Sequence, residues 1–150
     1  MPFLYWIDYA MDYTLETVLQ KGIQAQQAGN LNEAAQFYSA ILRAKPQHPD
    51  ANHNMGALKL SKGELLEALQ YFELALEANA EIVQFWLSLI VTLIRLERFD
   101  DAKNVLERSH QKGLVDDRLE NLNNYFNDRL KSINSSPKID QAVLYREKGE

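Results

Sequence analysis

Histidine is the residue type with the most capacity for metal binding or acid–base catalysis in this chain, because the sequence contains no cysteine. The histidines His48, His53 and His110 lie on different predicted hairpins or turns and lack the spacing of a zinc site. The sequence has neither a glycine-rich phosphate loop nor a serine nucleophile elbow. We therefore expect no enzyme activity, no catalytic residues, no metal and no cofactor, and interpret His53 as a polar contact.

The composition is that of one globular domain. The chain has 150 residues, of which 46% are hydrophobic and 25% are charged, which is enough apolar material for a packed core. The net charge of −5 argues against nucleic-acid binding, which needs a basic surface to meet phosphates. The absence of cysteine suits a reducing compartment.

The N-terminus is apolar but does not resemble a targeting segment. The run Met1–Ile7 contains no basic residue, and Asp8 and Asp12 interrupt the apolar sequence that follows it. The run is too short to cross a membrane, and no other stretch reaches about 18 apolar residues. We expect no membrane insertion and a cytoplasmic location.

The sequence repeats with a period of 34 residues over 15–48, 49–82 and 83–114. One period later Gly22 is matched by Gly56, and Gly29 is matched by Gly63. The small residues Ala34, Ala68 and Ala102 recur in the same way. A fixed period of this size indicates stacked helix–turn–helix units.

The residues at key repeat positions resemble the tetratricopeptide repeat (TPR) family, whose pattern combines small residues, an aromatic residue and a final proline. The matching positions are Val18, Lys21, Gly22, Ala25, Ala34, Tyr38 and Pro46, then Asn52, Met55, Gly56, Lys59, Ala68, Phe72 and Ala80, then Trp86, Leu89, Ile90, Leu93, Ala102, Leu106 and Leu114. The resemblance implies an all-α fold, a right-handed α-solenoid of three helix hairpins, and protein binding rather than catalysis.

Turn and cap signals predict six helices within the repeats. They cover about Thr14–Ala28, Asn32–Ala44, Pro49–Lys62, Leu65–Ala78, Ile82–Leu96 and Asp100–Lys112, with Asn32 and Asp100 as N-caps. We expect Gly22 and Gly56 where the helices of one hairpin cross closely, opposite the repeated alanines. We expect the aromatic residues Phe37, Tyr38, Tyr71, Phe72 and Trp86 in the seams between hairpins.

The chain outside the repeats divides into three parts. Residues 1–14 are an aromatic segment, of which 3–12 are predicted to form a helix or an extended strip on the first hairpin. Residues 115–134 are predicted to form a helix that caps the solenoid. Residues 135–150 are a linker and amphipathic tail, or the start of a further truncated repeat. This ending suggests the N-terminal piece of a longer protein, or else a module with a docking tail.

In TPR proteins the first helix of each hairpin lines a concave groove, which implies a protein or peptide partner. The residues carried over are Leu19, Gln20, Ile23, Gln26, Gln27, His53, Asn54, Ala57, Leu60, Ser61, Leu87, Ser88, Val91, Ile94 and Arg95. Chaperone-binding members clamp a terminal carboxylate with Lys, Asn and Arg, and only Asn54 matches that set here. The asparagine row of O-linked N-acetylglucosamine transferases is also absent apart from Asn54.

Three alternatives follow from other features. The stretches Ala51–Gly56 and Gln84–Ser88 look like bacterial proteins in which such repeats precede a glycosyltransferase, sulfotransferase or methyltransferase domain, which implies substrate recognition for a larger enzyme. The residues Phe3, Tyr5, Trp6 and Ile7 are too apolar to be left in water, which favours self-association as a homodimer. Residues 49–82 carry six acidic residues against two lysines, which is either a solvated helix face or a docking patch for a basic partner.

Overall fold

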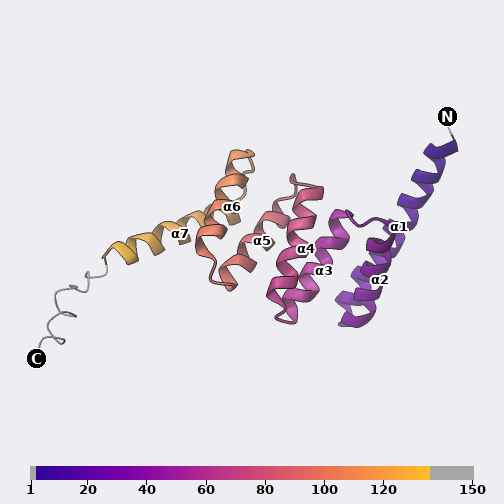
Figure 1. The fold of residues 1–150 in the computed structure, drawn as a ribbon, viewed down its shortest axis with the longest axis horizontal. Coiled ribbons are helices and arrows are strands. Elements are labelled where there is room, and N and C mark those ends of the chain that lie inside the picture. Colours follow the sequence, from indigo (N-terminus) through magenta and orange to yellow (C-terminus); the bar gives the residue numbers. More distant parts are fainter. Residues whose placement is uncertain (1–2, 136–150) are drawn as a thin grey trace, which may run out of the picture. The chain divides into compact units, whose positions relative to one another are not determined.

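The computed structural model describes the backbone of residues 3–135 and the side chains of 14–132. All the regular secondary structure in this part of the chain is helical. The helices are α1 Phe3–Gln27, α2 Leu31–Ala44, α3 Pro49–Ser61, α4 Leu65–Ala78, α5 Val83–Arg95, α6 Phe99–Gln111 and α7 Asp117–Ser135 (Figure 1). The chain divides at Leu114 into two compact units, so that α1 to α6 form one unit and α7 belongs to the other.

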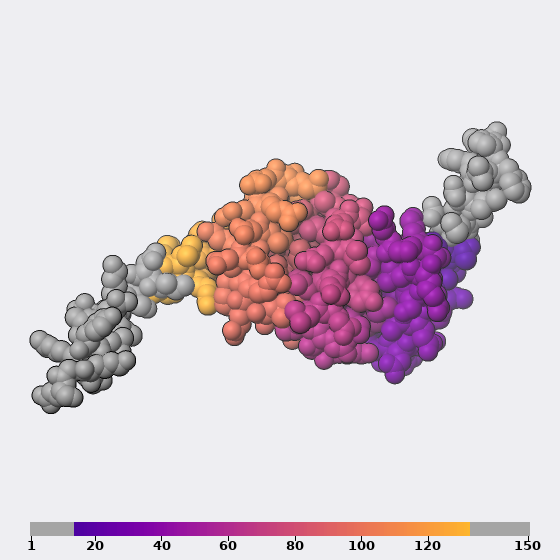
Figure 2. All heavy atoms as spheres, in the orientation of Figure 1, coloured from indigo at the N-terminus to yellow at the C-terminus, as the bar shows by residue number. Residues whose placement is uncertain are grey.

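The six helices of the first unit form three antiparallel hairpins stacked in chain order. The pairs α1–α2, α3–α4 and α5–α6 pack within hairpins, and α2–α3 and α4–α5 pack between them. The hairpins follow one another across the space-filling view (Figure 2). The first helices α1, α3 and α5 also contact one another in sequence. The predicted all-α repeat fold is therefore confirmed.

A left-handed residue ends the first helix of each hairpin. Gly29 and Gly63 have φ values of 81° and 77°, and Glu97 occupies the same repeat position with φ of 60°. The residue that follows each of them donates its backbone N–H to a carbonyl five residues earlier, for example Arg98 to Leu93 at 2.9 Å. This is the hydrogen bond of a Schellman turn, and it reverses the chain within three residues.

The second helix of each hairpin begins directly after this turn, so the predicted N-caps are wrong. The residues at the caps are Asn30 and Arg98, and their side chains accept no capping hydrogen bond. Asn32 and Asp100 already lie inside α2 and α6. The turn geometry decides where these helices begin, and side-chain capping does not.

Helix α3 has a side-chain cap, which the sequence did not predict. His48 Nδ1 accepts a hydrogen bond from the backbone N–H of Ala51 at 3.2 Å, and Pro49 opens the helix. The buried amide of Asn52 donates to the carbonyls of Pro46 and His48, both at 3.0 Å. These bonds fix the turn that joins the first two hairpins.

The first helix begins earlier than predicted. Helix α1 begins at Phe3, whereas the repeat pattern predicted a start near Thr14 after a separate segment 1–14. Neither proline nor glycine occurs between Phe3 and Thr14, so nothing interrupts the helix. Figure 1 shows the N-terminal half of α1 running past the end of α2. The side chains of 3–13 lie outside those that the structure describes.

Two aromatic rings lie inside the hairpins rather than in the predicted seams. A methyl group added at Gly22 would lie 2.6 Å from Cε1 of Tyr38, and one added at Gly56 would lie 2.7 Å from Cε1 of Phe72. Tyr38 and Phe72 are both fully buried. The glycines therefore make room for an aromatic ring of the partner helix, and the alanines are not their closest neighbours.

Helix α7 covers the segment predicted as a cap, and its own charges organise its first turn. Arg118 pairs with Asp116, with Nε 2.9 Å from Oδ1. The capping role of α7 stays a prediction. Residues 136–150, and with them the predicted amphipathic tail, lie outside the described part of the chain.

Candidate interaction surfaces

The predicted binding residues of α1, α3 and α5 form what we call the first-helix face. Its half-buried or exposed members are Gln20, Ile23, Gln26, Gln27, His53, Asn54, Ala57, Leu60, Ser61, Ser88, Val91, Ile94 and Arg95. Two predicted members do not belong to it. Leu19 and Leu87 are only 3% and 7% exposed, so they pack in the core and offer no surface to a partner.

A hydrogen bond joins the second and third repeats on this face. His53 Nε2 on α3 lies 2.9 Å from Ser88 Oγ on α5. Gln84 Nε2 donates to the same hydroxyl at 3.3 Å, and Thr92 Oγ1 donates to the Ser88 carbonyl at 2.7 Å. The polar groups of α5 are thereby tied to α3.

The His53 ring lies between two aromatic rings. Its centroid is 4.8 Å from that of Phe85 in a stacked arrangement and 5.4 Å from that of Phe72. Burial lowers the pKa of the imidazole below its ordinary value, against the opposing effects of the Asn54 side chain and the Asp50 carboxylate. The polar contact predicted for His53 is present as its hydrogen bond with Ser88.

Tyr38 makes one polar contact within the first hairpin and one with the second repeat. Tyr38 Oη donates to Gln26 Oε1 at 2.7 Å, which links α2 to α1. Burial raises the pKa of the Tyr38 phenol, and a hydrogen bond with the Asn54 side chain opposes that rise. Asn54 thus lies beside the Tyr38 phenol of the first repeat and the His53 imidazole of its own repeat.

The C-terminal end of the face is more apolar. Val91 on α5 is 41% exposed, and Ile94 and Leu60 are half-buried. Arg95 Nη1 lies 3.5 Å from the Leu60 carbonyl oxygen, at the limit of a hydrogen bond. The exposed side chain of Val91 thus lies on the same face as the Ser88 hydroxyl and the Asn54 amide.

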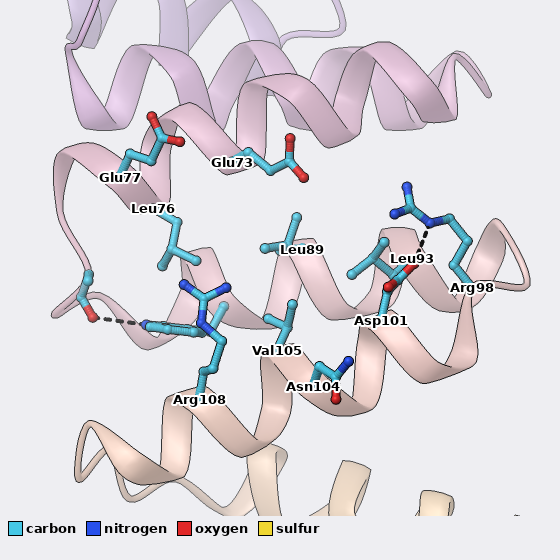
Figure 3. Close-up of a pocket in the computed structure, with 12 residues that line it drawn as sticks. Glu73, Leu76, Glu77, Leu89, Leu93, Arg98, Asp101, Asn104, Val105 and Arg108 are labelled. Atoms are coloured by element: carbon cyan, nitrogen blue, oxygen red, sulfur yellow. Dashed lines mark hydrogen bonds and ion pairs between the residues drawn. The ribbon is translucent and has the colours of Figure 1, made fainter.

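A cavity of about 530 Å³ lies away from this face, between α4, α5 and α6 (Figure 3). We call it the α4–α6 cavity. Its floor consists of buried apolar side chains, which are Leu76, Trp86, Leu89, Leu93 and Val105. Its walls carry Glu73 and Glu77 from α4, and Arg98, Asp101, Asn104 and Arg108 at or on α6.

The charged side chains of the α6 wall are held by neighbours. Arg98 Nε donates to Asp101 Oδ2 at 2.7 Å. The guanidinium carbon of Arg108 lies 5.8 Å from the centroid of the Trp86 ring, within the range of a cation–π contact. Trp86 Nε1 in turn donates to the Ala80 carbonyl at 2.9 Å, which fixes the ring (Figure 3).

Sequence reasoning did not predict the α4–α6 cavity as a site. The available signal was the acidic excess of residues 49–82, because two of those six side chains, Glu73 and Glu77, line the cavity. The cavity itself arises from three helices of two repeats, and a repeat pattern does not indicate such a space.

Among the described residues, no group of three or more His, Cys, Asp or Glu side chains could hold a metal ion. Within the same part of the chain, no helix combines the length and apolar character that crossing a bilayer requires.

Comparison with known proteins finds a family match over one of the three repeats. A family model for the tetratricopeptide repeat matches residues 49–82 of this chain. A comparison with curated proteins gives no match.

Solved structures with a similar fold include three TPR proteins. The TPR domain of Sgt2 from Aspergillus fumigatus is 18% identical with a TM-score of 0.71, and the match covers 85% of this chain and 87% of that one. The first TPR of Spaghetti (RPAP3), bound to the HSP90 peptide SRMEEVD, is 18% identical with a TM-score of 0.69, covering 78% and 93%. YrrB, a TPR protein with an unusual peptide-binding site, is 24% identical with a TM-score of 0.58, covering 63% and 48%.

Proposed function

Because residues 49–82 are a tetratricopeptide repeat and the chain has the fold of TPR domains, we propose that it is a non-catalytic protein-interaction scaffold. Its first-helix face binds an extended peptide segment of a partner protein. Stacked repeats present a continuous surface of this kind, and the RPAP3 domain of similar fold was solved with a peptide bound.

The main support for the proposal is an exposed apolar side chain close to a hydroxyl group on α5. Val91 leaves 41% of its side chain exposed on α5, one helical turn after the hydroxyl of Ser88. An extended peptide needs partners for its backbone N–H and C=O groups and a place for alternate side chains. Ser88 and Asn54 can supply the hydrogen bonds, and Val91 with its apolar neighbours can supply the side-chain contact.

The charges of the face favour an internal peptide segment over a terminal carboxylate. Arg95 is the one cation among the residues that define the face, and it lies at the C-terminal end of α5. Recognition of a carboxylate at a protein surface is strongest when several charged donors converge on it. The side chains of this face are instead mostly amides, hydroxyls and aliphatic groups.

The test is a selection of peptide ligands followed by variants. A phage-displayed library of random linear peptides is panned on the full chain, and recovered peptides are titrated against Asn54→Ala and Val91→Asp. We expect the affinity to fall by about tenfold or more with either variant, because a central contact is lost or an unpaired charge is buried. Leu66→Asp is the matched control, since Leu66 on α4 is 65% exposed and lies outside the face.

Two outcomes would reject the proposal. One is a selection that recovers no binding peptide at all. The other is a set of peptides whose affinities are the same for Val91→Asp, Asn54→Ala and Leu66→Asp.

Self-association is a second candidate function, favoured by the length of α1. This helix has 25 residues, and its N-terminal half, which carries Phe3, Tyr5, Trp6 and Ile7, runs past the end of α2 (Figure 1). Light scattering coupled to size exclusion, on the full chain and on a copy lacking residues 1–12, tests this directly. A dimer that becomes a monomer on truncation would support it, and a monomer in both cases would reject it.

Two finer predictions of the sequence belong with these proposals. One is a cytoplasmic location, and the other is substrate recognition for a larger bacterial modifying enzyme. The second would use the same first-helix face, with the enzyme's own substrate as the bound segment. It predicts a gene that encodes a nucleotide-sugar or cofactor domain together with these repeats.

A further inference from the structure

We propose that the α4–α6 cavity is a second, separate binding site for a partner segment of basic and apolar character. The segment inserts one bulky apolar side chain, such as Leu, Phe or Met, between α4 and α6. A Lys or Arg close to it in the partner sequence pairs with Glu73 and Glu77. The walls of this site lie on α4 and α6, and α5 contributes only floor residues that do not belong to the first-helix face, so the two sites share no residue.

The cavity has the volume and the floor that such a side chain needs. Its 530 Å³ lies within the range of about 300–1,000 Å³ that is typical of ligand pockets. Leu76, Leu89 and Val105 face the space from three different helices (Figure 3). An apolar side chain placed there would be removed from water on several sides, which is the main source of binding free energy at such sites.

The rim indicates an open trough rather than an enclosed pocket. Glu73 and Glu77 on one wall and Asn104 and Arg108 on the other are exposed. A trough with exposed walls suits a side chain presented on a polypeptide backbone better than a fully enclosed small molecule. The occupant is therefore a peptide segment.

The α4 wall supplies two carboxylates for which no ion pair is found among the described residues. Glu64 and Glu67 both pair with Lys59, and Glu81 pairs with Lys112 at 2.8 Å. For Glu73 and Glu77 no ion pair is found among the described residues. They are four residues apart on one helix, so their side chains lie on the same side of α4 and can act on one cation together (Figure 3).

The charges on the α6 wall determine which side of the cavity binds the cation of the partner. Arg98 is held by Asp101, and Arg108 is held over Trp86. The cation of the partner therefore lies against α4, and any carboxylate of the same segment lies against Arg108. This arrangement distinguishes a specific contact from a general attraction between an acidic protein and a basic peptide.

The experiment first disables the proposed first-helix face, so that the two sites are read separately. The random peptide library is panned on the full chain carrying Asn54→Ala and Val91→Asp. Recovered peptides should contain Lys or Arg within about four residues of a bulky apolar residue, the spacing that one helical turn or a short strand provides. Their affinities are then measured with Glu77→Lys and, as the matched control, Glu107→Lys.

The two variants change the net charge equally, but only Glu77 lines the cavity. Glu107 is an exposed residue of α6 outside the cavity wall. We expect Glu77→Lys to weaken binding by about tenfold or more, since it replaces an attraction by a repulsion, and Glu107→Lys to change it less than about twofold. Both positions are exposed, so unfolding curves of the two variants should remain like that of the parent.

A spectroscopic readout places the peptide in the cavity. The chain has two tryptophans, and Trp6→Phe leaves Trp86 in the cavity floor as the only one. Binding of a peptide without tryptophan should then change the Trp86 emission. The proposal is overturned if no peptide is recovered, if the peptides lack a cation, if Glu77→Lys and Glu107→Lys act equally, or if Trp86 emission does not respond.

Discussion

The imidazole Nε2 of His53 and the hydroxyl of Ser88 lie 2.9 Å apart, and this contact joins α3 to α5 across the boundary between two repeats. The His53 ring is also stacked on Phe85 of the third repeat and tilted against Phe72 of the second. The boundary between these repeats therefore combines a neutral polar contact with aromatic packing. A charge on the imidazole would be poorly solvated there, which makes this boundary sensitive to pH.

We expect the stability of the chain to fall as the pH drops through the ordinary histidine pKa of 6.5. Burial lowers the His53 pKa in the folded state, so below 6.5 the unfolded state binds more protons than the folded state. The stabilisation from neutral His53 is fully present above 6.5 and is lost progressively below it. Urea unfolding from about pH 7.5 to about pH 5 measures this slope.

His53→Gln should reduce that slope, because glutamine does not titrate and can still reach a hydroxyl. His110→Gln, at an exposed position of α6, is the matched control for the loss of one histidine. His48 also accepts a hydrogen bond at the α3 cap. Because His48 is unchanged in all three proteins, it does not contribute to the difference between their slopes. Equal slopes for the His53→Gln variant and the unsubstituted chain would contradict the assignment.

Glu97 lies at the left-handed position where the first two repeats have glycine. A side chain at positive φ costs about 1–2 kcal/mol, and part of this is offset because glycine also loosens the unfolded chain. We therefore expect Glu97→Gly to raise the free energy of unfolding by about 0.5–1 kcal/mol. Urea unfolding measures the change.

Two controls separate backbone strain from charge. Glu97→Ala removes the same carboxylate but keeps a Cβ, so it should give no comparable gain. Gly63→Ala places a Cβ at φ of 77° in open space, and should destabilise by about 1 kcal/mol through the backbone alone. A gain from Glu97→Ala as large as that from Glu97→Gly would attribute the effect to charge instead.

The close approach of Gly56 and Phe72 predicts an overpacking penalty. A methyl group at position 56 would lie 2.7 Å from a carbon of the Phe72 ring, and Phe72 is fully buried. Helix propensity favours alanine over glycine by about 1 kcal/mol, but overpacking costs about 1–3 kcal/mol. We expect Gly56→Ala to lower the unfolding free energy by about 1 kcal/mol net.

A double-mutant cycle with Phe72→Leu tests the cause. If the ring is what the methyl group meets, Gly56→Ala should be neutral or stabilising in the Phe72→Leu background, with a coupling of at least about 1 kcal/mol. Additive effects of the two substitutions would show that the strain has another origin.

Most helix bounds could be predicted from the sequence because the period and the turn glycines are local signals. Helix α4 was predicted at Leu65–Ala78 and forms over those residues. The errors arise where tertiary or backbone geometry decides. The repeat pattern does not include residues 3–13, so it could not predict that α1 begins at Phe3. The caps at Asn32 and Asp100 failed because the preceding turn already fixes the first helical residue.

The candidate surfaces could be predicted only in part, for a related reason. Leu19, His53 and Leu87 occupy the same place in successive repeats, and the sequence assigned all three to an open groove. The structure buries Leu19 and Leu87 and half-buries His53, since this position faces the boundary between neighbouring repeats. The α4–α6 cavity depends on how side chains of three helices fill space, which repeat spacing does not encode.

The indole of Trp86 should contribute to stability through its hydrogen bond as well as through its burial. Its Nε1 donates to the Ala80 carbonyl at 2.9 Å in the turn between α4 and α5, and the ring is 3% exposed. Trp86→Phe keeps an aromatic side chain but leaves that carbonyl without its partner and part of the ring volume empty. We expect a loss of about 1–3 kcal/mol in the free energy of urea unfolding. Arg108→Ala removes only the contact above the ring and should cost about 0.5–1 kcal/mol, as expected for an exposed cation–π pair. If the two variants destabilise equally, the hydrogen bond to Ala80 is not what holds this turn.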